Sequence, residues 1–316
     1  MRLSSLAALL VLGVAAATLP ACASNTPAPP AASPSDMPEG LVTGDQGVAP
    51  TGRDGLGGPG ASASSKPAAK PLAAGNPNGK ATVPAEARAV DTSKPTRTVG
   101  TGTPASCTSA AVVKAVAAGG VIAFDCGPAP ATIKMTATAK VRNANGPKVV
   151  LDGGGRVTLS GQGKRRILYM NTCDEAQGWT TSHCQNQDHP QLTVQNLTFA
   201  DGNSTGDRAE GGGGGAIFVR GANPAKSGTP GGGSGGSIYC DGNEFTVRIA
   251  GTIIENNKAN EGGGAIFFVS NNRTGTMKIE NSTLRRNPSG KFETSGYPGI
   301  FFLGARNPTV TGSKLT

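Results

Sequence analysis

The sequence predicts an all-β solenoid, in which short strands and turns recur along the chain and stack on one another. Three observations lead to this prediction: the strand-like segments end at Gly, Asn or Asp, a unit of about thirty residues recurs, and only one segment has a helical pattern. Glycine supplies 48 of the 316 residues and charged residues only 16 %, which is too little charge for a helical bundle. One unit cannot bury an apolar face alone, so we expect neighbouring units to stack.

The first 22 residues have the pattern of an export signal. Arg2 precedes an apolar stretch, residues 6–19, which is too short to span a bilayer comfortably. Leu19-Pro20-Ala21-Cys22 resembles a bacterial lipobox, after which Cys22 becomes the lipid-modified first residue. The alternative is ordinary cleavage after residues 21–23, which discards Cys22. We expect the lipid anchor, which holds a protein on a membrane surface without spanning it.

Residues 23–105 are expected to be a disordered tether rich in Pro, Gly and Ala. They contain no aromatic residue, and none of the thirteen aromatic residues of the chain precedes Phe124. Such a segment cannot bury enough apolar surface to offset the entropy of ordering it. The folded domain is therefore expected over residues 106–316.

The predicted elements of this domain are one helix and many short strands. Thr108 or Ser109 can cap a helix over residues 109–118, whose valines share one face, and Gly119-Gly120 ends it. Strands are expected over residues 121–124, 149–151, 157–159, 167–170 and 192–194. The helix precedes the first repeat, so we expect it to close that end of the stack.

Two sequence blocks recur. The first block aligns residues 196–202 with 250–256 and 281–287, at offsets of 54 and 31, and residues 310–315 follow 279–284 at 31. The second block aligns Gly-Gly-Ala-Ile-Phe at 214–218 with residues 263–267 and, more loosely, with 298–301. The longer first interval is assigned to a glycine-rich insertion, residues 221–236. The offset of 31 places Glu255 level with Arg286, which predicts an exposed ion pair between adjacent units.

The second block predicts which side chains are buried. Alternation along a strand places one column, Ile217, Ile266 and Ile300, on the opposite side from the next column, Phe218, Phe267 and Phe301. Burying a large ring stabilises a protein by about 1.5–3 kcal/mol, so we expect the phenylalanines inside. The isoleucines, with Val219, Phe268 and Phe302, would then form an outer apolar stripe, either a contact site or covered by residues 221–236.

The N-terminal part of the domain resembles exported bacterial proteins with a pectin lyase-like fold. The resemblance rests on Cys107-Thr108 followed by Ala118-Gly-Gly-Val-Ile-Ala-Phe-Asp-Cys-Gly127, and on residues 149–155 and 157–161. The Gly-Gly-Ala-Ile and Asn-x-Thr repeats are similar to those of polymorphic outer membrane proteins. The resemblance covers about residues 106–316 and implies a right-handed parallel β-helix. That fold hosts lyases, hydrolases, adhesins and proteins of no known activity.

Cysteine usage fits an oxidising compartment. Without Cys22, five cysteines remain, and the economical pairs are Cys107–Cys126 and Cys173–Cys184, with Cys240 unpaired. Other pairings stay open, because connectivity cannot be deduced from sequence. An alternative for one group, Cys173, His183, Cys184 and His189, is a zinc site. Its spacing matches no common zinc pattern, and a disulfide loop that carries Trp179 is the preferred interpretation.

No catalytic residue can be assigned from the sequence. Asp201, Asp207 and Glu210 are candidate ligands for calcium, with Arg208 as a base, but a solvated acidic loop is preferred. The paired aspartates and the Arg-Pro signature expected of polysaccharide lyases are absent. We expect no resident cofactor, and calcium is the alternative.

The charge balance favours acidic polymers as partners. Residues 106–316 carry 21 Lys and Arg against 14 Asp and Glu. Nucleic acid is not expected, because the basic-aromatic strips of nucleic-acid-binding modules are missing. The preferred hypothesis is a non-catalytic protein, lipid-anchored at the cell envelope or outer membrane, that binds glycan or mediates adhesion. The alternative is a polysaccharide lyase or glycoside hydrolase that acts on acidic polysaccharide.

Overall fold

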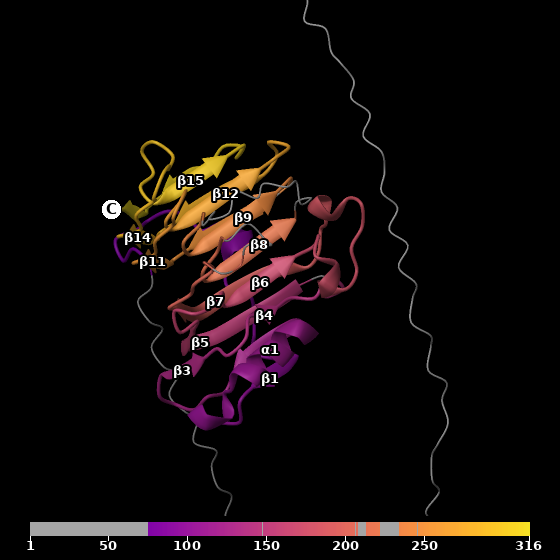
Figure 1. Ribbon diagram of the computed structural model, residues 1–316. Helices are drawn as coiled ribbons and strands as arrows, with labels where there is room; N and C mark the ends of the chain where they lie inside the picture. The colour runs from indigo at the N-terminus through magenta and orange to yellow at the C-terminus, as the bar shows by residue number, and fades with distance from the viewer. Residues whose placement is uncertain (1–74, 147, 206, 208–212, 222–233, 245) are drawn as a thin grey trace, which may run out of the picture. The chain divides into compact units, whose positions relative to one another are not determined.

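The computed structural model describes residues 75–316, apart from residues 147, 206, 208–212, 222–233 and 245. The predicted all-β class is confirmed: one α-helix and many short strands are present, and every strand pairing among the described residues is parallel. Figure 1 shows the strands stacked in chain order, from β1 beside α1 to β15 near the C-terminus.

The N-terminal half contains the helix and the longest strands. In chain order it comprises η1 (Ala85–Ala87), β1 (Arg97–Val99), η2 (Pro104–Ser106), α1 (Ser109–Ala118), β2 (Gly120–Phe124), β3 (Ala131–Lys134), β4 (Ala139–Lys140), β5 (Lys148–Ser160), β6 (Leu168–Asn171), η3 (Glu175–Gln177), η4 (Cys184–Asn186) and β7 (Gln191–Ala200).

In the C-terminal half, the elements that the structure describes are short strands. They are β8 (Ile217–Gly221), β9 (Ile238–Gly242), β10 (Thr246–Ala250), β11 (Ile253–Glu255), β12 (Ile266–Ser270), β13 (Thr276–Glu280), β14 (Thr283–Arg285), β15 (Ile300–Leu303), β16 (Thr309–Thr311) and β17 (Lys314–Leu315).

Four parallel sheets collect equivalent strands from successive repeats. One sheet has the order β1-β2-β5-β3, with β7 also paired to β5, and another has the order β15-β12-β9-β8-β6-β4. The last two sheets are β10-β13-β16 and β11-β14-β17. The last three repeats, which begin with β9, β12 and β15, therefore each contribute one strand to each of three sheets.

Helix α1 begins and ends as predicted. The Thr108 hydroxyl accepts a hydrogen bond from the backbone N–H of Ala111 at 3.2 Å, and Gly119 ends the helix with a φ of 69°. Val112 and Val116 are completely buried. Among the described residues, the structure contains no helix that is long and apolar enough to cross a membrane.

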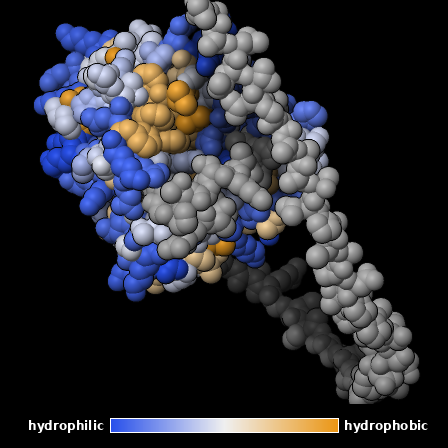
Figure 2. All heavy atoms as spheres, turned by 45° about the horizontal axis from the view of Figure 1, so that its top comes forward, coloured by the Kyte–Doolittle hydropathy of each residue, from blue (hydrophilic) through white to orange (hydrophobic). Residues whose placement is uncertain are grey.

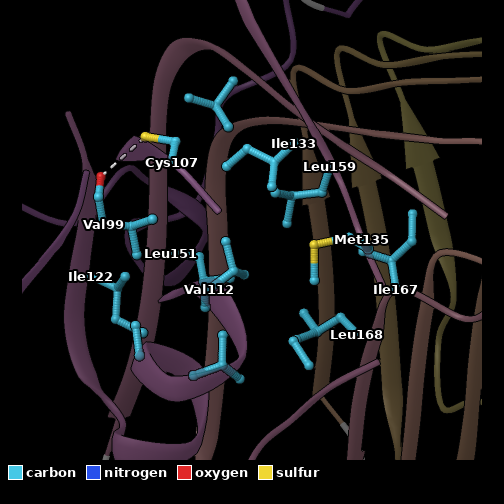
Figure 3. Close-up of a cluster of buried hydrophobic side chains, with 14 of the residues drawn as sticks. Val99, Cys107, Val112, Ile122, Ile133, Met135, Leu151, Leu159, Ile167 and Leu168 are labelled. Carbon is cyan, nitrogen blue, oxygen red and sulfur yellow. Dashed lines mark hydrogen bonds between the residues drawn. The ribbon is translucent and has the colours of Figure 1, made fainter. Parts of the chain in front are cut away.

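The interior is one apolar column. Figure 3 shows its first part, where Val112 of α1 lies among side chains of the first sheet, including Ile122 and Leu151. Phe268, Met277 and Ile300 belong to the second part, which the later repeats build. Val219 packs against both parts and so joins them.

The repeat register is partly as predicted. Ile279 pairs with Val310, which confirms the offset of 31 between the last two repeats. Thr246 pairs with Thr276, however, so the preceding offset is 30 and the predicted alignment is wrong by one residue there. The backbone conformation at the corner between consecutive strands explains the difference. In each of the aligned repeats one corner residue has a left-handed conformation: Asn196, Gly251, Asn281 and Gly312 have φ values of 50°, 56°, 49° and 59°. Asn and Gly adopt this conformation readily, so Gly251 and not Ala250 is the equivalent of Asn281.

The predicted ion pair between repeats is confirmed. An Arg286 Nη2 to Glu255 Oε2 distance of 3.0 Å defines it, and Arg285 Nε also approaches the same oxygen, at 2.5 Å. Arg285, not Arg286, is the register neighbour of Glu255. These arginines hold the pKa of the Glu255 carboxyl below its ordinary value, chiefly through the hydrogen bond from Arg285.

Strand β9 corrects the interpretation of residues 221–236 as an insertion between two repeats. Ile238 pairs with Ile217 on one side and with Ile266 on the other, so β9 lies between β8 and β12. The two ends of that segment thus belong to separate repeats. Residues 235–239 are a further copy of the Gly-Gly-Ala-Ile-Phe block. Ser237 and Tyr239 replace the Ala and Phe of the neighbouring repeats, so the copy is not recognised in the sequence.

The predicted orientation of the phenylalanine column is wrong. Ile266 and Ile300 are completely buried in the interior, whereas Phe218 belongs to a separate cluster. The outer rings form an aromatic ladder, which consists of Tyr169, Phe218, Tyr239, Phe267 and Phe301, with neighbouring centroids 4.9–5.3 Å apart.

Backbone covers part of the ladder: Tyr169, Phe218 and Tyr239 are buried, while Phe267 and Phe301 are half-buried. A Cβ atom at Gly213 would lie 2.3 Å from the ring of Tyr239, so this glycine permits the close approach of a turn. Rings buried under such turns gain the same free energy as rings in the core. The predicted outer stripe of isoleucines with Val219, Phe268 and Phe302 therefore does not exist.

Residues 75–99, here called the N-terminal strap, differ from the expected tether. The Asn281 side chain exchanges two hydrogen bonds with the backbone of Ala81, at 2.8 and 2.9 Å. Gln195 does the same with Val90, at 2.8 and 3.0 Å. The strap then continues into β1, which pairs with β2. It thus runs from the last repeats back to the first, and polar side chains hold it until β1, where Val99 is buried in the core.

Both predicted disulfides are present. Cys107 is bonded to Cys126 and Cys173 to Cys184, while the buried Cys240 forms no disulfide with any described residue.

The Asp152 carboxylate attaches the strap to β5 and makes the stability depend on pH. Burial raises its pKa, but hydrogen bonds from Thr92, Gly154, Gln195 and Asn196 outweigh this and hold the pKa below its ordinary value. The stabilisation is therefore present above the unfolded pKa, about 3.9, and is lost as the pH falls through the lowered folded value. We expect Asp152→Ala to cost about 1–3 kcal/mol of unfolding free energy at pH 7.

Urea unfolding of the wild type and Asp152→Ala at pH 7 and near pH 2.5 measures this effect. The difference between them should shrink at the acid pH, and an undiminished difference would contradict the assignment. Asp125→Ala is the control, because the Asp125 side chain has no hydrogen-bond partner among the described residues.

Candidate functional site

The only tryptophan of the chain lies on the surface. Trp179 is 41 % exposed, one of four large hydrophobic side chains that the structure exposes in the described part of the chain. It stacks on His189, with the ring centroids 5.6 Å apart and the planes 16° apart. Both residues belong to the connection between β6 and β7, here called the Trp179 loop (residues 172–190). An exposed aromatic ring held on a support offers a flat, fixed apolar surface to a ligand.

The Trp179 loop is closed at its base. The Cys173–Cys184 disulfide joins its two arms. The Thr172 hydroxyl donates to the Cys184 carbonyl at 2.6 Å, and the Thr180 hydroxyl donates to the Thr172 carbonyl at 2.8 Å. Trp179 thus lies within a segment closed by a disulfide, so binding a ligand there would require little loss of conformational entropy in the loop.

Asp174 joins the loop to the aromatic ladder. Its Oδ2 accepts hydrogen bonds from the Tyr169 hydroxyl and from Gln177 Nε2, both at 2.9 Å. Asn171 Nδ2 donates in turn to the Tyr169 hydroxyl at 3.0 Å. The position of the loop therefore depends on the first ring of the ladder, which is completely buried.

A second attachment comes from the chain after β4. The completely buried Asn143 donates through its backbone to the Gln177 carbonyl at 3.1 Å and through Nδ2 to the Asp174 carbonyl at 3.1 Å. Arg142 Nη1 donates to the Ala176 carbonyl at 2.8 Å. Helix η3 is thereby fixed from two sides.

His189 supports the tryptophan ring and has its own partner. Its Nδ1 lies 2.6 Å from Oδ1 of Asp188, and this contact lowers the pKa of the exposed Asp188 carboxyl. A Cβ atom at Gly146 would lie 3.2 Å from the histidine ring, so the chain before β5 backs the ring closely. Asp188 thus remains a carboxylate at neutral pH beside the stacked rings.

The arrangement is suited to binding sugars. The flat ring of Trp179 offers an apolar surface to the C–H groups of a pyranose, and the Asp188 carboxylate can accept hydrogen bonds from its hydroxyls. The exposed side chains of Thr181 and His183 add further polar groups on the same loop.

The alternative zinc site is not formed. Cys173 and Cys184 are joined in the disulfide, so neither thiolate is free to bind a metal. The described residues contain no cluster of three or more His, Cys, Asp and Glu side chains suited to a metal ion.

The two described candidate calcium ligands, Asp201 and Asp207, have different partners. Asp201 Oδ2 accepts a hydrogen bond from the Ser160 hydroxyl at 2.9 Å, whereas Asp207 Oδ2 lies 3.3 Å from Arg166 Nη1. Glu210, Arg208 and the lipidation candidate Cys22 lie outside the described residues.

Arg166 is a residue whose role no sequence signal revealed. Its guanidinium is buried 4.3 Å from the centroid of the Phe218 ring and donates to the Gly213 carbonyl at 2.7 Å. It therefore fastens the covering turn to the ladder and compensates its own burial.

Cys240 and Tyr239 are not reactive groups at neutral pH. Burial and, to a smaller extent, the Asp241 carboxylate together raise the pKa of the Cys240 thiol to about 12. Burial and Asp241 also raise the pKa of the Tyr239 hydroxyl. Both groups stay protonated, so neither serves as a nucleophile or base.

The disulfide at the base of the loop predicts a local effect of its removal. We expect Cys173→Ser with Cys184→Ser to cost about 2–3 kcal/mol of stability, since the bond closes a loop of 11 residues. Acrylamide quenching of fluorescence should rise, because Trp179 is the only tryptophan and its support loosens. The far-ultraviolet circular dichroism should stay that of the wild type. Unchanged quenching would show that the disulfide does not hold Trp179.

Comparison of the chain with protein-family models, with curated proteins and with solved structures finds no match.

Proposed function

We propose that this protein is a non-catalytic, right-handed parallel β-helix that binds glycan at the bacterial cell envelope through the Trp179 loop. The single observation that carries the proposal is the exposed Trp179 ring, supported by His189 on a loop closed by a disulfide.

The strand pairing supports the proposed β-helix. In the β10-β13-β16 and β11-β14-β17 sheets, successive repeats contribute one strand each at offsets of 30 and 31 residues, and the strands pair in parallel. A left-handed residue recurs at equivalent corners, where the chain turns from one sheet to the next. The resemblance of residues 106–316 to pectin lyase-like proteins points to the same fold.

Location at the envelope is supported by two features. The two disulfides fit an oxidising compartment outside the cytosol. The lipobox-like residues 19–22 favour a lipid on Cys22, which would tie the chain to a membrane.

The proposed ligand is a cell-surface glycan, and acidic polysaccharides are the preferred class. The excess of Lys and Arg over residues 106–316 favours polyanions through long-range attraction. The alternative function, a polysaccharide lyase or glycoside hydrolase, requires a group of carboxylates or a base near the bound sugar.

Retention on immobilised glycans tests the proposal. We expect the wild type to be retained on at least one of polygalacturonate, alginate and neutral galactan. Trp179→Ala should weaken retention at least about tenfold, the effect of losing a central aromatic contact. Phe292→Ala is the matched control, because Phe292 is 40 % exposed on a different part of the molecule and should retain full binding.

Two outcomes would overturn the proposal. Equal retention of Trp179→Ala and the wild type would reject the site, as would no retention on any of the three glycans. New unsaturated or reducing ends on these glycans would establish the enzyme alternative instead.

A further inference from the structure

The outer face of the long sheet changes from polar to apolar along the stack. In the column two residues beyond the aromatic ladder, the first repeats carry Asn171, Arg220 and Asp241, which are register neighbours on β6, β8 and β9. The last two repeats carry Val269 and Leu303 in the same column. Polar contacts among the repeats thus give way to an apolar surface at β12 and β15.

This surface is exposed. Leu303 is 59 % and Phe292 is 40 % exposed, and both belong to the four large hydrophobic side chains that the described residues expose. The end patch is defined here as Phe267, Val269, Phe292, Phe301 and Leu303. Figure 2, in which the β15 end of the molecule comes forward, shows hydrophobic residues gathered in one area with hydrophilic residues around them.

Two arginines border the end patch. Arg273 lies beside Gly304, at which a Cβ atom would be 3.5 Å from Arg273 Cγ. Arg306 donates through its backbone to the Gly275 carbonyl at 2.7 Å, so it follows Leu303 on the same edge. Both side chains are exposed and, within the described part of the chain, have no carboxylate partner within 4.0 Å.

The acidic groups near the end patch are already engaged. Glu261 pairs with Lys291, with Oε1 and Nζ 3.1 Å apart, and Glu293 accepts a hydrogen bond from the backbone of Gly299 at 2.9 Å. Residues 246–316 contain nine Lys and Arg against four Asp and Glu. Among the described basic residues, Arg273 and Arg306 therefore leave positive charge at this edge that no ion pair neutralises, whereas Arg285, Arg286 and Lys291 are paired.

The chain that leads to Cys22 enters at this end of the stack. Asn76 Nδ2 donates to the Gly312 carbonyl at 2.8 Å, and the Asn76 N–H donates to the Asn281 carbonyl at 2.7 Å. The strap begins there, beside the last two repeats, and runs away toward α1. Residues 23–74 thus connect the proposed lipid to the same end of the stack that carries the end patch.

We infer that the end patch rests on an anionic lipid surface. Leu303 and Phe292 enter the apolar boundary of the bilayer, while Arg273 and Arg306 contact lipid phosphates. The orientation rests on the proposed lipid at Cys22, whereas the affinity of the patch does not. The protein would stand with its last repeats on the membrane, and the Trp179 loop, between β6 and β7 in the earlier repeats, would lie away from the membrane.

Sedimentation with vesicles tests this inference on the chain from residue 23, which lacks the signal and the lipid and contains the whole compact unit, residues 66–316. We expect binding to vesicles of phosphatidylglycerol mixed with phosphatidylcholine and little binding to phosphatidylcholine alone. Arg273→Asn with Arg306→Gln should weaken binding about fivefold per arginine. Asn suits position 273, where φ is 64°. Leu303→Ser should weaken binding about tenfold.

Matched controls separate this inference from the glycan proposal. Lys114→Gln with Lys134→Gln removes the same charge from exposed positions in the first repeats and should leave vesicle binding unchanged. Trp179→Ala removes an equally exposed ring and should also leave it unchanged, although it is expected to lose glycan retention. Far-ultraviolet circular dichroism of each variant verifies folding.

Several results would overturn the inference. These are an absence of vesicle binding, equal binding to both lipid compositions, and equal losses in the patch and control variants. A dimer that Leu303→Ser dissociates, seen by light scattering in the absence of lipid, would assign the end patch to a second copy of the chain instead.

Discussion

Parallel hydrogen bonding between equivalent strands is the constraint on which the rest of this structure depends. It places like residues of successive repeats directly over one another, at the spacing of about 4.8 Å between strands. The aromatic ladder follows, since Tyr239 pairs with both Phe218 and Phe267 and its ring stacks on both. The ion pair of Glu255 with Arg285 follows in the same way. Side-chain contacts along the stack are thus consequences of the backbone register.

The same constraint explains why the strap is needed. A stack of parallel strands satisfies its backbone groups along the axis, but the corners between sheets expose amides that no strand reaches. Asn281 and Gln195 stand at or beside such corners and pair with the backbone of the strap as a neighbouring strand would. Because the strap touches both early and late repeats, it couples units that otherwise contact only their neighbours.

Much of the fold could be predicted because the repeats and the helix caps can be recognised in short segments of the sequence. Thr108 and Gly119 mark the helix, and the recurring Gly-Gly-Ala-Ile block marks the strands. The orientation of Phe218 could not be predicted, because burial under a turn and burial in the core gain the same free energy. The ordering of residues 75–105 was also hidden. It depends on hydrogen-bond partners such as Asp152 that are distant in the sequence, and no apolar pattern in the sequence indicates these contacts.

The candidate sites lie in a connection and in an outer column whose residues do not recur, which is why a search for repeats finds the scaffold and misses its surfaces. Trp179 belongs to the connection between β6 and β7, and only the two cysteines around it indicated a special loop. The end patch arises where Val269 and Leu303 replace polar residues of the same column, a change that only the register exposes. In a solenoid the interior and the ladder must repeat, so residues are free to diverge only in the connections and on the outer columns. Trp179 lies in such a connection, and Val269 and Leu303 lie in such an outer column.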